Sequence, residues 1–169
     1  MFVESPGLLD ESCLVDASST MLFRLRVDEW CRNSSSATIT FGHISSWNTS
    51  KITDMSSLVG FYCRTFSTFN ADISNWNTSS VTRLYRTFWG ATSFTGDGVS
   101  NWDTSKVTSL SLTFNAATSF TGDGVSNWDT SRVTNLYDAF RDAVSLDLSN
   151  LKSWNVSNVM SWSDNTFPQ

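Results

Sequence analysis

Residues that could carry acid–base or nucleophilic chemistry are few in this chain of 169 residues. The single histidine, His43, has no acid or nucleophile near it in the sequence with which to form a dyad. Asp103 and Asp129 occupy one repeated position, where other repeats hold Asn48, Asn77 and Asn155. An amide cannot act as an acid or base, so hydrogen bonding to nearby backbone explains this position better. The sequence therefore predicts no catalytic residue and no enzyme.

Metal-binding patterns are equally weak. Gly96-Asp97-Gly98 and Gly122-Asp123-Gly124 resemble parts of nonapeptide calcium repeats, but the nine-residue period is absent and the glycines suit tight turns. The three cysteines contain no Cys-x-x-Cys pair. They leave two alternatives open, a Cys13–Cys31 bridge or three small buried side chains. We expect no metal and no cofactor.

The composition excludes several classes of protein. The net charge is −5 and only 16% of residues are charged, while Ser and Thr number 30 and 20 and aromatic residues 23. A pI near 4.6 gives nucleic-acid binding no electrostatic basis. Abundant aromatic residues and only two prolines argue against disorder. We expect no transmembrane segment, and no signal peptide is visible.

A repeat organises most of the chain. Tryptophans with the same following residues recur at spacings of 29, 26, 26 and 26 residues, at Trp47, Trp76, Trp102, Trp128 and Trp154. About four residues are inserted into the first repeat near 59–64. These positions divide a region of about 4.5 repeats, 47–169, into 47–75, 76–101, 102–127, 128–153 and 154–169. Each repeat is expected to form one coil that buries its apolar face on its neighbours.

Two elements are expected within each coil. Lys106-Val107-Thr108 and its equivalents are rich in β-branched residues and predict a short strand in a parallel ladder. Leu110, Phe114 and Ala117 recur at i, i+4 and i+7, a spacing typical of a short helix with one buried face. The predicted fold class is therefore an α/β repeat, and the predicted architecture is a solenoid of short parallel strands and short helical turns.

The first 40 residues do not share the repeat. Apolar residues in 18–31 predict an amphipathic helix, with Arg24, Asp28 and Glu29 on its polar side. A stack of coils has an open end that must be covered. We expect 18–46 to form an N-terminal capping helix and lead-in, and 1–17 to form an irregular N-terminal arm.

The repeats resemble a known family. Trp47-Asn48-Thr49-Ser50-Lys51-Ile52-Thr53-Asp54-Met55 and Phe69-Asn70-Ala71-Asp72-Ile73-Ser74-Asn75-Trp76 are similar to BspA-like leucine-rich repeats, which are also described from mycoplasma surface lipoproteins and are common in marine algae. The resemblance covers about 41–169. It implies a leucine-rich-repeat-like right-handed solenoid, displayed at the cell surface or secreted as an adhesion or protein-binding module, without catalytic residues.

Positions that differ between otherwise similar repeats indicate a partner surface. Arginine and aromatic residues freed from packing are the types enriched at protein interfaces. They predict binding of another protein through these residues: Arg83, Tyr85, Arg86, Trp89, Tyr137, Arg141, Trp162 and Phe167. The competing interpretation is ordinary variation at a surface, with the aromatic residues partly packed.

Three alternatives remain open. The incomplete fifth repeat and its apolar tail favour a structural accessory subunit docked permanently in a larger assembly, which would place the chain in an organelle. Two threonine columns, one beginning at Thr49 and one at Thr53, would suit an ice-binding solenoid only if both lay on one flat exposed face. The sequons at Asn33, Asn48, Asn77 and Asn155 suit a secreted protein, but three lie in the repeat itself.

Overall fold

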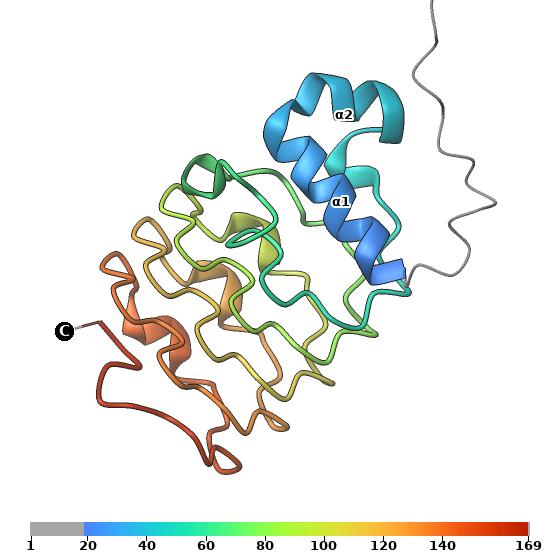
Figure 1. The fold of residues 1–169 in the computed structure, drawn as a ribbon. Coiled ribbons are helices and arrows are strands. Elements are labelled where there is room, and N and C mark those ends of the chain that lie inside the picture. The colour runs from blue at the N-terminus through green and yellow to red at the C-terminus, as the bar shows by residue number, and fades with distance from the viewer. Residues whose placement is uncertain (1–18, 169) are drawn as a thin grey trace, which may run out of the picture.

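The structure is a computed structural model that describes residues 19–168. Two helices, α1 (Ser19–Arg32) and α2 (Ser34–Phe41), pack against each other. Figure 1 shows them at one end of a stack of irregular coils, with the C-terminus at the opposite end. α1 lies where the sequence predicts the amphipathic helix, and Phe23 and Val27 provide its buried side. The expected N-terminal arm lies outside the described residues.

Short 3-10 turns are the regular elements of the coils. Their bounds are η2 (Ile44–Ser46), η3 (Phe66–Thr68), η4 (Asp97–Val99), η5 (Asp123–Val125) and η6 (Leu148–Leu151). Four of these turns lie just before a repeat tryptophan, η2 immediately before it and η4, η5 and η6 with two residues between. The backbone N–H of each of these tryptophans bonds to the carbonyl three residues earlier, as Trp47 does to the Ile44 carbonyl. We call the repeats 47–75 to 154–168 the first to fifth coils.

The expectation of a leucine-rich-repeat-like solenoid with short parallel strands and helical turns is wrong. Within residues 19–168 there is no strand, and the repeats contain no α-helix. One residue per coil forms an isolated parallel bridge to the next coil, in the order Asp54, Arg83, Ser109, Asn135 and Ser161. The predicted ladder is therefore one residue wide.

Alternating backbone hydrogen bonds explain the missing helix and strand. In the second coil, every second amide donates to the third coil, and these donors are Leu84, Arg86, Phe88 and Gly90. The amides of Thr87, Trp89 and Ala91 instead bond to the carbonyl three residues earlier in the same coil, which closes four-residue turns. Arg86 and Gly90 have φ of 56° and 72°, which interrupts both an α-helix and an extended strand. The i, i+4, i+7 spacing therefore belongs to a chain of turns.

Aromatic side chains fill the core in parallel columns. The indoles of Trp76, Trp102, Trp128 and Trp154 stack with ring centroids 6.2 to 6.3 Å apart. Each indole N–H donates to a backbone carbonyl 29 to 32 residues earlier in the chain, as Trp128 Nε1 does to Val99 O at 3.0 Å. Buried aromatic N–H groups need such partners, so this column combines packing with hydrogen bonding. A second stack contains Phe88, Phe114, Phe140 and Phe167.

Threonine hydroxyls connect the coils on both sides of the bridges. Thr49, Thr78, Thr104 and Thr130 are buried, and each donates to a carbonyl of the next coil at 3.0 to 3.1 Å. Hydroxyls of the second column bond to the coil before, beginning with Thr82 to Thr53 O at 3.1 Å. Since the first column is buried, the two columns do not form the shared exposed face that ice binding requires.

The helical end is joined to the first coil by several contacts. Phe23 of α1 lies edge-on to Trp47 and Trp76, with centroids 6.2 and 5.1 Å away. Cys31 forms a disulfide with Cys63. The alternative of a Cys13–Cys31 bridge is therefore wrong for Cys31, and Cys13 lies outside the described residues. Cys63 lies in the insertion of the first repeat, so this insertion attaches the helices to the stack.

Candidate partner-binding surface

Four predicted residues come together on the second coil. Arg83, Tyr85, Arg86 and Trp89 are all exposed, with Tyr85 and Trp89 retaining 37% and 38% of their accessible area. The guanidinium carbon of Arg86 lies 5.2 Å from the centre of the Tyr85 ring and 5.7 Å from that of Trp89. We call these four residues the second-coil surface. They place a cation against two aromatic faces, an arrangement stabilised by the ring quadrupoles.

The backbone of the second coil positions these side chains. Arg83 is the bridge residue, and the amides at Leu84 and Arg86 bond to the third coil. Buried Leu84, Thr87 and Phe88 alternate with the exposed residues and fix the segment on the core. The positive φ of Arg86 turns the chain between two inter-coil bonds. The exposed side chains are thus carried by a backbone that is anchored on both sides.

Sequence reasoning missed aromatic residues of the first coil, one of which, Phe66, borders this surface. Phe61 is 75% exposed and packs edge-on against Tyr62, and Phe66 lies 6.2 Å from Trp89 between ring centroids. Arg24 of α1 lies 5.2 Å from the Tyr62 ring centre. The signal that could have identified them is the insertion at 59–64, which interrupts an otherwise regular repeat and contains two adjacent aromatic residues.

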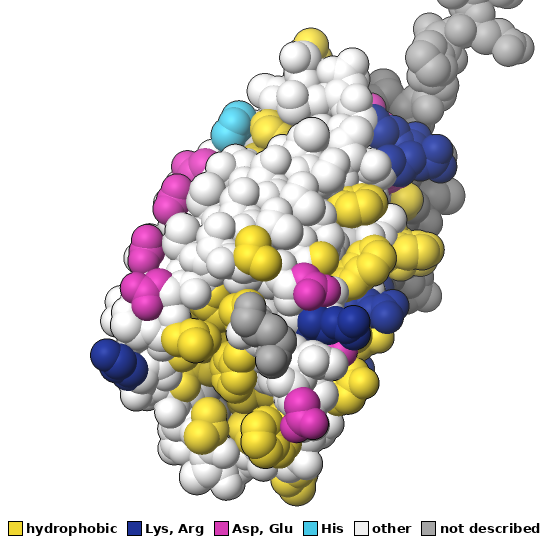
Figure 2. Space-filling model, turned by 90° about the vertical axis from the view of Figure 1, so that its left-hand side faces the viewer, with side chains coloured by type: hydrophobic (Ala, Val, Ile, Leu, Met, Phe, Trp, Pro, Cys, Tyr) yellow, Lys and Arg dark blue, Asp and Glu magenta, His cyan; other side chains and the backbone are white. Residues whose placement is uncertain are grey.

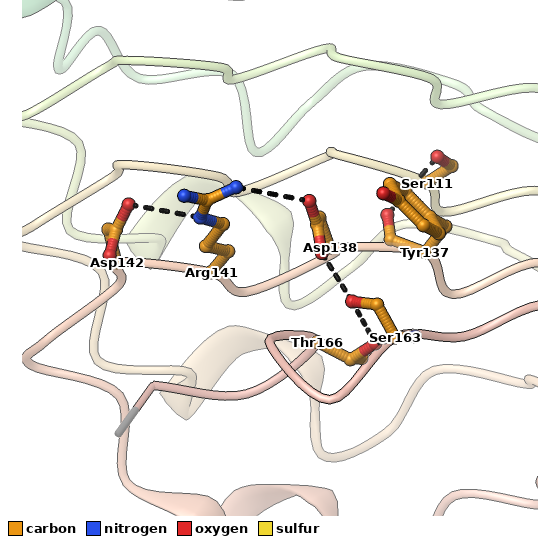
Figure 3. A network of polar contacts seen from close by, with 7 residues as sticks. All are labelled: Ser111, Tyr137, Asp138, Arg141, Asp142, Ser163 and Thr166. Atoms are coloured by element: carbon orange, nitrogen blue, oxygen red, sulfur yellow. Dashed lines mark hydrogen bonds and ion pairs between the residues drawn. The ribbon is translucent and has the colours of Figure 1, made fainter.

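In the fourth coil, the positions equivalent to the second-coil surface hold side chains with different contacts. Tyr137 is 46% exposed, but Arg141 lies 3.6 Å from an Asp138 oxygen and 3.5 Å from an Asp142 oxygen. Figure 3 shows this set, in which Asp138 also accepts a hydrogen bond from Ser163 of the fifth coil. We call Asp138, Arg141, Asp142, Ser163 and Thr166 the fourth-coil network. The predicted binding residue Arg141 is thus already paired with carboxylates.

The two predicted residues of the fifth coil lie in contrasting environments. Trp162 is 66% exposed, whereas Phe167 is only partly exposed and stacks on Phe140 at 6.0 Å. Val156 and Met160 lie on the same coil and are 55% and 81% exposed. The structure therefore places Phe167 in the core stack and leaves Trp162 accessible.

Charge is distributed unevenly over the surface. Figure 2 shows one face on which basic side chains lie beside hydrophobic ones, while acidic side chains form a row along one edge below the histidine. Large areas of this face carry neither charged nor hydrophobic side chains, consistent with the high content of Ser and Thr. Exposed apolar and basic groups on this face are therefore concentrated in limited areas.

The exposed aspartates of the repeat form local hydrogen bonds. Asp103 accepts from the backbone N–H and hydroxyl of Ser105 at 3.0 and 2.6 Å, and Asn48 makes the same two contacts with Ser50. Hydrogen bonds from the Ser105 hydroxyl, and then from its backbone, lower the pKa of Asp103 below its usual value. Ser131 lowers the pKa of Asp129 in the same way. This column stabilises turns, as the exchange of Asp for Asn predicts.

The groups considered for catalysis and metal binding have local contacts. His43 Nδ1 lies 2.7 Å from the Ser45 hydroxyl and accepts from the Ser45 backbone N–H at 3.3 Å, as a cap of η2. Among residues 19–168, no group of three or more His, Cys, Asp or Glu side chains could hold a metal ion. A hollow of about 280 Å³ beside the disulfide is lined by nine residues without a charged side chain, Cys63 and Trp30 among them.

Comparison with known proteins identifies the family. In the described part of the chain, no helix has the length and hydropathy needed to cross a bilayer. A search of the curated proteins and a search of the solved structures each found no match. One family model matches twice, over residues 30–122 and 96–167. These overlapping segments cover most of the chain, which therefore belongs to the family described as "Mycoplasma protein of unknown function, DUF285".

Proposed function

We propose that this chain is a non-enzymatic protein-binding module that contacts its partner through the second-coil surface. The observation that carries the proposal is the grouping of two arginines, a tyrosine and a tryptophan on one anchored coil, all exposed. Trp, Tyr and Arg dominate the energetic centres of protein interfaces. The third coil holds Ser109, Ser111 and Asn115 in place of Arg83, Tyr85 and Trp89, so the backbone does not require the larger side chains.

The resemblance to BspA-like repeats supports an adhesion role at the cell surface or in a secreted form. The disulfide between Cys31 and Cys63 agrees with an oxidising compartment, where such bonds persist. Both points support this localisation, and the proposed partner is another protein.

Partner capture with a matched pair of variants tests the proposal. Trp89→Asn copies the third coil, and Arg86→Asn places a residue that tolerates positive φ at this position. The double variant should recover much less partner than the unchanged chain from a native extract, with the same melting temperature. Lys106→Gln with Arg132→Gln removes charge from exposed positions elsewhere and should retain capture. Equal capture by all three proteins would refute the assignment of this surface.

A second candidate function is favoured by the exposed apolar side chains of the fifth coil. Val156, Met160 and Trp162 together suit a permanent contact in a larger assembly, as a structural accessory subunit would make. Native purification separates the two functions, because a constant partner in fixed stoichiometry indicates a subunit. Recovery of an isolated chain that binds only added partner indicates a recognition module.

A further inference from the structure

The second-coil surface carries positive charge that residues 19–168 do not neutralise. Within residues 19–168, no carboxylate lies within the 4.0 Å limit of an ion pair from Arg83 or Arg86. Arg86 contacts aromatic faces, which leave the edges of its guanidinium group available as hydrogen-bond donors. This local excess stands out in a protein whose net charge is −5.

The acidic residue nearest along the ladder is already engaged. Asp54 is the bridge partner of Arg83 on the first coil, but its carboxylate lies 3.6 Å from Arg24 and accepts from the Ser56 N–H at 2.8 Å. On the other side, the third coil presents Ser109, Ser111 and Leu112 in the columns of Arg83, Tyr85 and Arg86. The two arginines therefore have an engaged carboxylate on one side and uncharged residues on the other.

We infer that the second-coil surface binds a segment of another protein in which carboxylate side chains lie next to an aromatic or aliphatic side chain. This inference rests on the proposed function and names the chemistry of the partner. Arginine pairs with carboxylates through two parallel hydrogen bonds, and an Arg already held by aromatic rings loses little freedom in doing so. Trp89, with Phe66 of the first coil beside it, supplies the apolar contact.

The arrangement favours an extended segment over a compact ligand. Arg83, Arg86 and Trp89 occupy three separate exposed positions of one coil, so a single small anion would meet only part of the surface. An acidic segment with alternating side chains would reach both arginines and the tryptophan together. A small anion is therefore an outcome that the experiment must separate from a peptide.

Selection of random twelve-residue peptides on the full chain tests the inference without a known partner. The recovered peptides should be enriched in Asp and Glu beside Leu, Phe, Tyr or Trp. Binding of a labelled selected peptide should weaken at least about tenfold for Arg83→Ser combined with Arg86→Asn. It should change less than about twofold for the control, Lys106→Gln combined with Arg132→Gln, and should weaken as salt rises.

The outcomes separate this inference from the proposed function. Peptides that lose binding with Tyr85→Ser and Trp89→Asn, but carry no acidic excess and ignore the arginine variant, overturn the acidic partner and retain the binding surface. A selection that yields no peptide dependent on any of the four residues overturns both. Displacement of the selected peptide by millimolar inorganic phosphate or acetate as effectively as by unlabelled peptide indicates a simple anion site and also overturns the inference.

Discussion

The second and fourth coils hold their exposed arginines at equivalent parts of the repeat but in opposite electrostatic environments. At one left-handed position the second coil has Arg86 and the fourth has Asp138, and three residues later they have Trp89 and Arg141. Arg86 lies against aromatic rings and keeps its charge available, whereas Arg141 is paired with Asp138 and Asp142. The same backbone conformation therefore carries an accessible arginine in the second coil and an arginine paired with neighbouring carboxylates in the fourth. The difference depends on which side chains lie one and three residues away from the arginine.

The largest expected effect tests whether the two coils are equivalent beneath their surfaces. Phe88 and Phe140 are fully buried in the same stack, so replacement by Ala should cost each coil about 3–5 kcal/mol of unfolding free energy. Urea unfolding measures both. A cost for Phe140→Ala that is less than half that for Phe88→Ala would show that the fourth coil is packed less firmly. The two coils would then differ in their cores as well as on their surfaces.

The next effect separates the two charged residues of the shared left-handed column. Asp138→Ala removes a carboxylate that is 5% exposed and bonded to Ser163, and should destabilise the protein by about 2 kcal/mol. Arg86→Ala removes an exposed side chain and should cost no more than about 0.5 kcal/mol. Thermal unfolding of the two variants provides the comparison. Similar losses would contradict the division between a structural network and an available surface.

A smaller effect is expected in the second left-handed column. Gly90 has φ of 72°, and an added Cβ would lie 2.8 Å from Phe66 Cε2, so Gly90→Ala should cost about 1–2 kcal/mol. Asp142 already has a Cβ at φ of 60°, and Asp142→Ala should change stability by less than about 0.5 kcal/mol. Denaturant midpoints test this pair. A neutral Gly90→Ala would mean that Phe66 moves freely beside Trp89.

The smallest effect concerns acid. Asp129 of the fourth coil has a lowered pKa, while the second coil has Asn77 in this column. A lowered folded pKa contributes stability above the pKa of the unfolded chain, which is lost as the pH falls through the folded value. Asp129→Asn should therefore leave the melting temperature at pH 7 nearly unchanged and reduce its fall below pH about 4. An identical acid profile for both proteins would show that the Ser131 contacts add no stability.

The sequence predicted the core more successfully than the backbone. Trp76 and Trp102 lie in near-identical repeats, so their shared environment could be inferred from periodicity alone. The strands and helical turns were predicted wrongly because Arg86, Leu112 and Asp138 adopt positive φ without being glycine, and no residue type announces this. The backbone hydrogen bonds between neighbouring coils that stabilise these turns form only after the coils have stacked.

The sequence predicted which residue types lie on the surface, but not which of them form ion pairs with one another. Variation among repeats pointed to Arg86 and Arg141 equally, although only Arg141 lies beside carboxylates, at Asp138 and Asp142. The sequence did contain one signal of this pairing, which is the carboxylate of Asp138 three residues before Arg141. The Cys31–Cys63 bond joins an unrepeated helix to an insertion, so the repeat pattern contained no information about it.

Because that disulfide joins the helices to the first coil, the two ends of the stack should open at different rates. The helical end is joined covalently to the first coil. The fifth coil is held without a covalent bond, by ring stacking of Trp154 and Phe167 and by hydrogen bonds such as that from Ser163 to Asp138. Local opening begins where the fewest contacts must break. Amide exchange with deuterium should therefore advance from the fifth coil toward the first, and the second-coil surface, close to the covalent tie, should be among the last parts of the molecule to lose its shape.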